Sequence, residues 1–338
     1  MKTEILSDRS ETELRRAAQL LAENKLVAFP TETVYGLGAN ALNGDAVKRI
    51  FEAKGRPQDN PLIVHLESPQ KAEALAYTSE LYYKLAAAFM PGPITVIIPK
   101  KDVLPEAVTA GLDSVGIRVP LYAPARELIR IASVPIAAPS ANISGKPSPT
   151  KAEHVIADMA GRIEAILCGD DCKVGVESTV VKITGEDSLV ICRPGGVTEE
   201  MLKAVCGNVT IDPAVLSKFD GKPVSPGMKY RHYAPEASVE ILVGSEEMVE
   251  RFLSDKTDFA FICYSGDKKL QKNKNVLILG DENDSQEQAS KLFSCLRECD
   301  KDKSIKNIYA RMPKKNGVGL AVYNRLIKAA GFKITELK

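Results

Sequence analysis

Histidine is scarce in this sequence, and neither sign of charge is in excess. Only three histidines occur among 338 residues, His65, His154 and His232, and none belongs to an HxH or HExxH pattern. A zinc site built mainly on imidazole is therefore not indicated. Lys and Arg number 45 against 44 Asp and Glu. No global charge draws the chain to nucleic acid or to a membrane surface, so phosphate binding would have to come from local clusters.

Long apolar runs and CxxC pairs are also missing. No stretch of about 18 apolar residues occurs and the N-terminus has no signal-peptide pattern, so we expect a soluble, cytoplasmic protein without a membrane segment. The seven cysteines are odd in number, and the pairs Cys168/Cys172 and Cys295/Cys299 have the spacing of one helix face. Structural thiols are favoured, with a metal or redox site as the alternative.

Signatures of several enzyme classes are absent. The sequence contains no GxxxxGK[ST] phosphate loop, no GxSxG nucleophile motif and no kinase signature set. The polar clusters that it does contain offer hydroxyls, amides and cations rather than a general-base pair. This composition indicates catalysis by positioning and electrostatics, and it names no general base.

The pattern of apolar residues predicts two domains of different type. Over residues 1–207 strand and helix patterns interleave without a regular βαβ rhythm, which predicts a mixed α/β sheet with helices packed on it. Residues 208–238 hold four prolines and little periodicity, so we interpret them as a linker or a functional segment. Residues 239–338 alternate strand and helix patterns, as in a small Rossmann-like α/β domain, but no glycine-rich phosphate loop follows the first strand.

Several predicted elements of the first domain bear on the site. Strand patterns occur at 26–30, 62–66, 94–99 and 115–120. Helical patterns occur at 11–24, 44–53, 69–90, 123–132 and 150–160. Residues 31–38, rich in hydroxyls and glycine, are predicted to be a loop.

Two segments at the ends of these elements are candidate ligand loops. Lys54 and Arg56 lie two residues apart in the turn KGRPQDNPL, where a point charge and a guanidinium fork can converge on one anion. An exposed basic turn is the alternative. PTETVYGLG, residues 30–38, places hydroxyls and a tyrosine just after a strand, where α/β proteins bind ligands, although a capping turn would look similar.

A third group of candidates has small polar side chains. Ser140, Asn142 and Ser144 alternate in APSANISGKPSPT, so they would share one side of an extended segment. A plain Ser/Pro loop is the alternative. Ser178 and Thr179 lie at the mouth of a strand.

Cations inside or just after apolar strands form a fourth group. Arg193 ends a strand before the forced turn PGG, and Arg118 is a lone cation in the strand VGIRVP. A buried arginine needs an anionic partner, and we favour a ligand over a protein carboxylate for Arg118. The segment SPGMKYRHYAP, residues 225–235, carries more aromatic and basic residues than a plain tether, as if it docked on an anionic, flat ligand such as a nucleotide.

Taken together, these motifs resemble the threonylcarbamoyl-AMP synthase family in its longer two-domain form. The resemblance rests on eight segments that follow one another in order: PTETVYGLG, KGRPQDNPL, PGP, GIRVP, APSANISGKPSPT, ESTVV, RPGG and SPGMKYRHYAP. It implies a YrdC-like twisted mixed open sheet with a concave site, followed by the Rossmann-like domain. It also implies that L-threonine, bicarbonate or CO₂, and ATP with Mg²⁺ are converted to L-threonylcarbamoyl-AMP and pyrophosphate.

The resemblance also implies residue roles and partners. Lys54, Arg56 and Asn60 would hold the ATP phosphates, with Lys54 and Arg56 catalytic. The other implied contacts to ATP are Ser140, Asn142, Ser148, Arg193, His232 and Tyr233. Those implied for threonine are Thr33, Tyr35, His65, Arg118, Ala138, Ser178 and Thr179. We assign the threonine carboxylate to Arg118 and expect the linker to close over the ligand as a lid.

The product would pass to a separate tRNA threonylcarbamoyl-transferase for the t6A modification of adenosine 37 in tRNAs that read ANN codons, without a required tRNA contact or a resident metal. A module that binds RNA or a nucleotide without chemistry is the alternative. The absence of an RNP-type aromatic strand, a GXXG loop and a block of basic charge argues against it. A different carbamoyl or acyl adenylation on the same fold is a third possibility.

Overall fold

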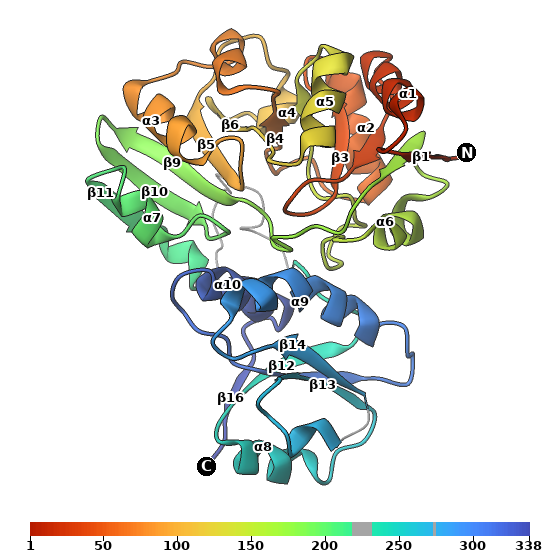
Figure 1. The fold of residues 1–338 in the computed structure, drawn as a ribbon, viewed down its shortest axis with the longest axis vertical. Coiled ribbons are helices and arrows are strands. Elements are labelled where there is room, and N and C mark those ends of the chain that lie inside the picture. The colour runs from red at the N-terminus through yellow and green to blue at the C-terminus, as the bar shows by residue number, and fades with distance from the viewer. Residues whose placement is uncertain (218–231, 273–274) are drawn as a thin grey trace. The chain divides into compact units, whose positions relative to one another are not determined.

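The computed structural model describes residues 1–217, 232–272 and 275–338. The chain divides into two compact units (Figure 1), the first comprising Met1–Ser144 and Ser148–Lys229 and the second Gly145–Pro147 and Tyr230–Lys338. No helix in these described ranges is long and apolar enough to cross a membrane.

The first unit is built on one mixed sheet, in the strand order β1-β8-β2-β3-β7-β4-β6-β5-β9-β10-β11. The strands are β1 (Glu4–Ser7), β2 (Val27–Phe29), β3 (Gly36–Asn40), β4 (Ile63–His65), β5 (Ile94–Pro99), β6 (Ser114–Arg118), β7 (Ile136–Ala137), β8 (Ala165–Cys168), β9 (Thr179–Gly185), β10 (Ser188–Arg193) and β11 (Asn208–Ile211). The helices are α1 (Glu11–Ala22), α2 (Gly44–Lys54), α3 (Glu80–Phe89), α4 (Glu106–Thr109), α5 (Ala123–Ala132), α6 (Ala152–Met159) and α7 (Glu199–Lys203), with 3₁₀ turns η1 (Pro69–Ala74) and η2 (Pro213–Val215).

Helices cover the two faces of this sheet unequally. α1 begins at the N-cap Ser10, whose side chain accepts from the Glu13 amide, and it packs with α5 on the face that carries Phe29 and Ile136. α2 and α3 bury their apolar sides in the larger core on the opposite face. On the first face, Ile63, Ile97, Val180 and Cys192 form a small cluster of their own beside the α1/α5 core. That part of the sheet carries the candidate site.

The second unit is a parallel sheet with helices on both faces, as predicted. Its strands, in the order β14-β13-β15-β12-β16, are β12 (Ser238–Val243), β13 (Phe259–Tyr264), β14 (Val276–Gly280), β15 (Asn307–Arg311) and β16 (Ile334–Glu336). Its helices are α8 (Glu246–Leu253), α9 (Ser285–Cys299) and α10 (Gly319–Ala329), with η3 (Leu270–Lys272). α9 and α10 lie on one face and α8 on the other (Figure 1).

Three sequence predictions need correction. The predicted loop 31–38 ends too late, because its last three residues, 36–38, belong to β3 (Gly36–Asn40), which lies between β2 and β7. Residues 69–90 are not one helix, because an isolated bridge between Ala76 and Lys100 separates η1 from α3. The predicted linker 208–238 begins too early, since β11 pairs in parallel with β10 and so belongs to the first sheet.

Candidate active site

Four predicted site residues and one further polar residue lie on the same face of the first sheet, as the pairing of its strands shows. His65 of β4 lies directly opposite Arg118 of β6, and Arg193 of β10 lies opposite Val180 of β9. Thr95 of β5 pairs with the same Val180, two residues after Ser178. Because side chains alternate along a strand, these residues face the side of the sheet that also bears Ile63 and Val180. We call His65, Thr95, Arg118, Ser178 and Arg193 the strand-face cluster.

Hydrogen bonds connect three members of the strand-face cluster, Thr95, Ser178 and Arg193. The Ser178 hydroxyl lies 2.8 Å from Thr95 Oγ1 and accepts from Arg193 Nη2 at 3.1 Å, while Arg193 Nε donates to the Ser178 carbonyl at 3.1 Å. Gly195 lies so close to the backbone of Glu177 and Thr179 that no side chain fits there. The turn PGG therefore fixes Arg193 against Ser178. Thr95 was not among the predicted site residues; its only signal was a hydroxyl inside the apolar run ITVIIP.

A second group, the lysine cluster, consists of Lys54, Ser140 and Asn142. Lys54 is the last residue of α2, which ends in Gly55 at φ +61°, a left-handed conformation that glycine adopts readily. Its side chain is only 2% exposed, and its ammonium donates to the carbonyls of Ser140 at 2.5 Å and Asn142 at 2.6 Å. The Ser140 hydroxyl donates to Asn142 Oδ1 at 2.5 Å. The structure thus brings together the basic turn and the small-residue loop, which lie far apart in sequence.

Residues 30–36 connect the two clusters. Glu32 Oε1 accepts from Arg118 Nη2 at 2.7 Å, and Gly36 forms an isolated bridge with Ser140. A second connection runs from Ser148, whose hydroxyl donates to Glu177 Oε1 at 2.5 Å, next to Ser178. The loop 30–36 is thus in contact with both clusters.

The anionic partner of Arg118 differs from the one that we predicted. We favoured a ligand over a protein group, but Glu32 forms a buried ion pair with Arg118. The sequence did contain this partner, in the middle of PTETVYGLG, although nothing in the spacing singled it out. Arg118 Nε is nevertheless buried without a hydrogen-bond partner within the described ranges. A contact between Arg118 and a substrate carboxylate thus stays a prediction.

Asn60 and Thr33, two further predicted site residues, are both buried. Neither the nitrogen nor the oxygen of the Asn60 amide has a hydrogen-bond partner among the residues that the structure describes. An unsatisfied buried amide is costly, which is consistent with a polar ligand there. Thr33 lies 2.9 Å from Thr31, oxygen to oxygen, within a turn of the loop.

Two predicted threonine contacts are instead occupied by protein groups. The Tyr35 ring is fully buried in the larger core, and its hydroxyl donates to the Gly169 carbonyl at 3.1 Å. Burial raises the pKa of this phenol. The Thr179 hydroxyl donates to the Val197 carbonyl at 2.6 Å. The contact of these two residues with threonine stays a prediction. Ala138 is also buried, in the core under α1 and α5.

Tyr233 and His232 belong to the second unit. Tyr233 has φ +65°, and its ring lies 5.3 Å from the Phe293 ring with Arg325 over it at 6.0 Å. The His232 ring is 5.7 Å from that of Tyr233. Their contact with ATP stays a prediction, and the rest of the predicted lid, residues 218–231, lies outside the described residues.

The cysteines and acidic residues give no sign of a metal centre. Burial raises the pKa of all seven thiols, which favours structural roles. Within residues 1–217, 232–272 and 275–338, no group of three or more His, Cys, Asp or Glu side chains could hold a metal ion.

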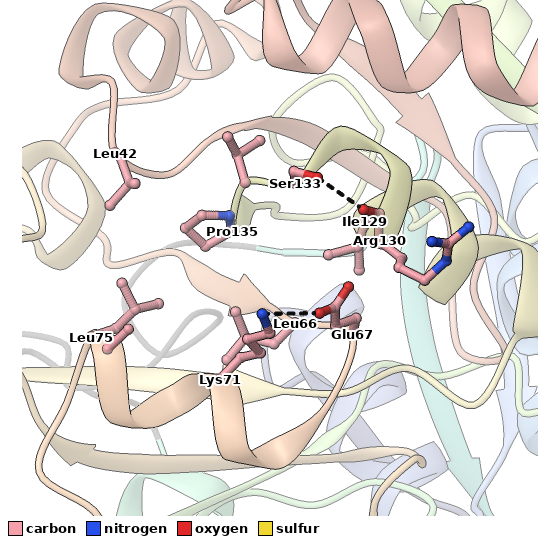
Figure 2. Close-up of a pocket in the computed structure, with 11 residues that line it drawn as sticks. Leu42, Leu66, Glu67, Lys71, Leu75, Ile129, Arg130, Ser133 and Pro135 are labelled. Atoms are coloured by element: carbon pink, nitrogen blue, oxygen red, sulfur yellow. Dashed lines mark hydrogen bonds and ion pairs between the residues drawn. The ribbon is translucent and has the colours of Figure 1, made fainter.

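A pocket of about 290 Å³ lies apart from these clusters (Figure 2). Its walls are mainly apolar, from Leu42, Leu66, Leu75, Ile129 and Pro135, and a Lys71–Glu67 ion pair lies at its edge. None of the predicted site residues lines it. It therefore does not coincide with the candidate active site.

His65 is held in its neutral form. Burial, and then the positive charge of Arg118, lower the pKa of its imidazole to about 3, and Nδ1 lies 3.2 Å from the Ile63 carbonyl. A neutral imidazole next to Arg118 adds no further positive charge to the strand-face cluster. It offers hydrogen bonds rather than charge to a ligand.

The depressed pKa of His65 predicts a loss of stability in acid. Between its ordinary value of 6.5 and about 3, the unfolded chain binds a proton that the folded chain excludes, so the free energy of unfolding falls as pH falls. The contribution reaches about 1.4 kcal/mol per pH unit. Urea unfolding of wild type and His65→Gln between pH 7 and pH 4 checks this, and the variant should show the shallower pH dependence. Parallel curves for the two proteins would contradict a buried neutral His65.

Known proteins resemble this chain along nearly its whole length. Family models described as "Telomere recombination" and "Threonylcarbamoyl-AMP synthase, C-terminal domain" match residues 19–195 and 197–331. The threonylcarbamoyl-AMP synthase of Pyrococcus abyssi is 46% identical, over 97% of this chain and 96% of its own. That of Bacillus subtilis is also 46% identical, over 96% of this chain and 95% of its own.

Solved structures agree with this likeness. P. abyssi Sua5 complexed with L-threonine has a TM-score of 0.92 at 44% identity, and the match covers 100% of both chains. E. coli YciO, at 17% identity and a TM-score of 0.50, matches 57% of this chain and 94% of its own, which shows the fold of the first unit alone.

Proposed function

The chain belongs to the threonylcarbamoyl-AMP synthase family, and on that premise we propose that it joins L-threonine, bicarbonate and ATP into L-threonylcarbamoyl-AMP and pyrophosphate. As a transfer of the AMP group to a carbamate, this is a nucleotidyltransferase reaction. The product is the intermediate for the N6-threonylcarbamoyl modification of adenosine 37 in tRNAs that read ANN codons. A separate tRNA transferase consumes it, so we place the enzyme in the same compartment, the cytoplasm.

The observation that carries this proposal is that one loop, residues 30–36, is in contact with both clusters. Residues 30–36 touch Arg118 of the strand-face cluster through Glu32 and Ser140 of the lysine cluster through Gly36. The reaction needs an amino acid and a nucleotide side by side, because the carbamate made on one attacks a phosphate of the other. Two polar clusters that share a loop suit two such ligands.

We assign threonine to His65, Arg118 and Ser178 of the strand-face cluster, and ATP to the lysine cluster together with Arg193. Nε of Arg118 has no hydrogen-bond partner among the described residues. Arg118 would donate to the threonine carboxylate. Thr33, His65 and Ser178 would surround the rest of the amino acid. The nucleotide would contact Lys54, Arg56, Asn60, Ser140, Asn142, Ser148 and Arg193. His232 and Tyr233 complete the set of contacts that we propose for ATP.

Magnesium would arrive as part of the nucleotide substrate. The described residues include no carboxylate cluster that could bind the ion by itself. Phosphate oxygens and water would therefore supply most of its ligands, as is usual for Mg²⁺ bound with ATP.

Positioning and charge explain the chemistry in this scheme. The neutral threonine amine attacks the carbon of bicarbonate or CO₂, and its nitrogen loses a proton as the carbamate forms. With bicarbonate, a C–O bond breaks and the hydroxide that leaves takes up this proton as water; with CO₂, the proton passes to solvent. A carbamate oxygen then attacks the α-phosphorus, and pyrophosphate leaves with the electron pair of the broken P–O bond. Lys54, Arg56 and Arg193 would offset the negative charge that develops on the phosphates, which is worth most in a buried site. Because His65 is neutral, no positively charged imidazolium would lie next to the threonine amine.

Pyrophosphate release tests this function directly. The full chain is incubated with ATP and Mg²⁺, and threonine and bicarbonate are each left out in turn. We expect release only when both are present. Release with threonine alone would indicate ordinary amino-acid activation, whereas no release from folded protein would favour a binding module without chemistry.

A further inference from the structure

Glu32 forms a buried carboxylate contact that the reaction scheme above does not use. Oε1 accepts from Arg118 Nη2 at 2.7 Å, and Oε2 accepts from the Leu121 amide at 2.9 Å. The side chains of Glu32 and Arg118 are only 6% and 4% exposed. Both oxygens of the carboxylate thus have partners, one on a charged side chain and one on the backbone just after β6.

The geometry of this contact restrains the guanidinium. Glu32 holds Nη2, and Thr31 Oγ1 lies 3.4 Å from the same nitrogen. The Leu121 contact fixes the carboxylate itself, so Arg118 is held against a rigid anchor rather than a mobile side chain. Nε is left buried without a hydrogen-bond partner among the described residues. A guanidinium fixed at one nitrogen with another unsatisfied is oriented for a second acceptor.

Stability alone is a poor explanation for such a pair. Removing two charges from water is so costly that a buried ion pair often stabilises a protein no more than a well-packed apolar pair of similar volume. Elsewhere in the chain, Arg130 and Glu127 form a comparable contact of 2.6 Å on the surface of α5, with side chains 59% and 41% exposed. Because that pair is exposed, forming it removes little water from the two charges, and neither residue belongs to the strand-face cluster or the lysine cluster.

We propose that Glu32 is a positioning residue, which orients Arg118 toward the carboxylate of the amino-acid substrate. This inference rests on the function proposed above. It predicts that Glu32 determines binding of threonine but not of ATP. A carboxylate that merely held the loop together would affect both substrates, because residues 30–36 also reach Ser140. A carboxylate that occupied the threonine site would instead weaken binding by competing with the substrate.

The direction of the change in threonine affinity separates these roles. In Glu32→Gln, which keeps the size of the side chain, we expect the KM for threonine to rise by about tenfold or more, since a small misplacement of a binding group is costly. The KM for ATP should stay within about twofold of wild type, as fits a group that acts only on the amino-acid side. A fall in the threonine KM, or an equal rise for both substrates, would overturn the proposal.

Binding measurements keep this test independent of turnover. Equilibrium dialysis with labelled threonine should show saturable binding to wild type and to Glu127→Gln, the matched control that removes the exposed pair, and weaker binding to Glu32→Gln. If wild type binds no threonine, the proposed function fails; if Glu32→Gln binds as tightly as wild type, only the role of Glu32 fails. Should Glu32→Gln not fold, Glu32→Asp keeps the charge at a shorter reach. It should raise the threonine KM to a lesser extent, and an unchanged value would refute the positioning role.

Discussion

Replacing Lys54 with methionine should lower kcat/KM for ATP by about 10²–10³-fold, the usual effect of losing one preorganised donor in a buried site. The ammonium is the only charged group that the structure shows donating to both Ser140 and Asn142 within the described residues. Its loss removes a cation from the proposed phosphate site and leaves the carbonyls of Ser140 and Asn142 without the hydrogen bonds that Lys54 donates. Steady-state pyrophosphate release at varied ATP measures the effect.

Lys48→Met is the matched control for this substitution. Lys48 lies on the same helix, α2, and pairs with Asp45 on the surface, with side chains 52% and 91% exposed. Its replacement should change neither activity nor stability appreciably, because exposed pairs contribute about 0–1 kcal/mol. Lys54→Met with near wild-type kcat/KM would rule out the phosphate role. Unfolding curves separate a loss of function from a loss of fold, since unpaired buried carbonyls cost about 1–3 kcal/mol each.

Gly195→Ala should destabilise the first unit by about 3 kcal/mol or more, the upper end for forced overpacking. A Cβ at this position would lie 2.3 Å from the Thr179 nitrogen and 2.7 Å from the Glu177 carbonyl oxygen. Both atoms belong to the backbone at the start of β9, so neither can yield as a side chain would. Relief would require Arg193 and Ser178 to separate, and activity should fall with stability.

Gly266→Ala provides the comparison for Gly195→Ala. No atom lies within 4 Å of a Cβ built at Gly266, in the turn after β13. Its replacement should change the free energy of unfolding by less than about 1 kcal/mol. Urea unfolding of both variants measures the difference, and equal midpoints would show that the turn PGG tolerates a side chain after all.

Local patterns were sufficient to predict most elements of the fold. The β-branched runs at 94–99 and 115–120 became β5 and β6, and the amphipathic segment after Ser10 became α1. Elements whose residues lack such a pattern were missed. β3 contains two glycines in five residues and is stabilised by its neighbours β2 and β7, whereas β11 follows a cysteine-glycine turn inside a proline-rich segment.

The sequence was enough to select several residues of the candidate site, but not to predict which residues contact one another. The residue types at Lys54, Ser140, Ser178 and Arg193 were enough to select them, because cations and small polar groups at element ends suit a phosphate ligand. The Glu32–Arg118 pair depends instead on a loop and a strand end that lie 86 residues apart. The burial of Tyr35 likewise depends on where β3 lies, since a tyrosine after a strand looks the same from sequence whether it faces a ligand or the core.

The order of strands in the first sheet also determines when its N-terminal strand can pair while the chain is being synthesised. β1 has a single neighbour in the sheet, β8, with Glu4 opposite Ala165 and Ser7 opposite Cys168. While the ribosome is still elongating the chain, the first strand therefore has no partner until residue 168 has emerged. Such distant pairings slow folding and leave an edge exposed in the meantime. This edge of the first sheet should consequently form only after about half of the chain has been made, although β1 is the first strand to emerge.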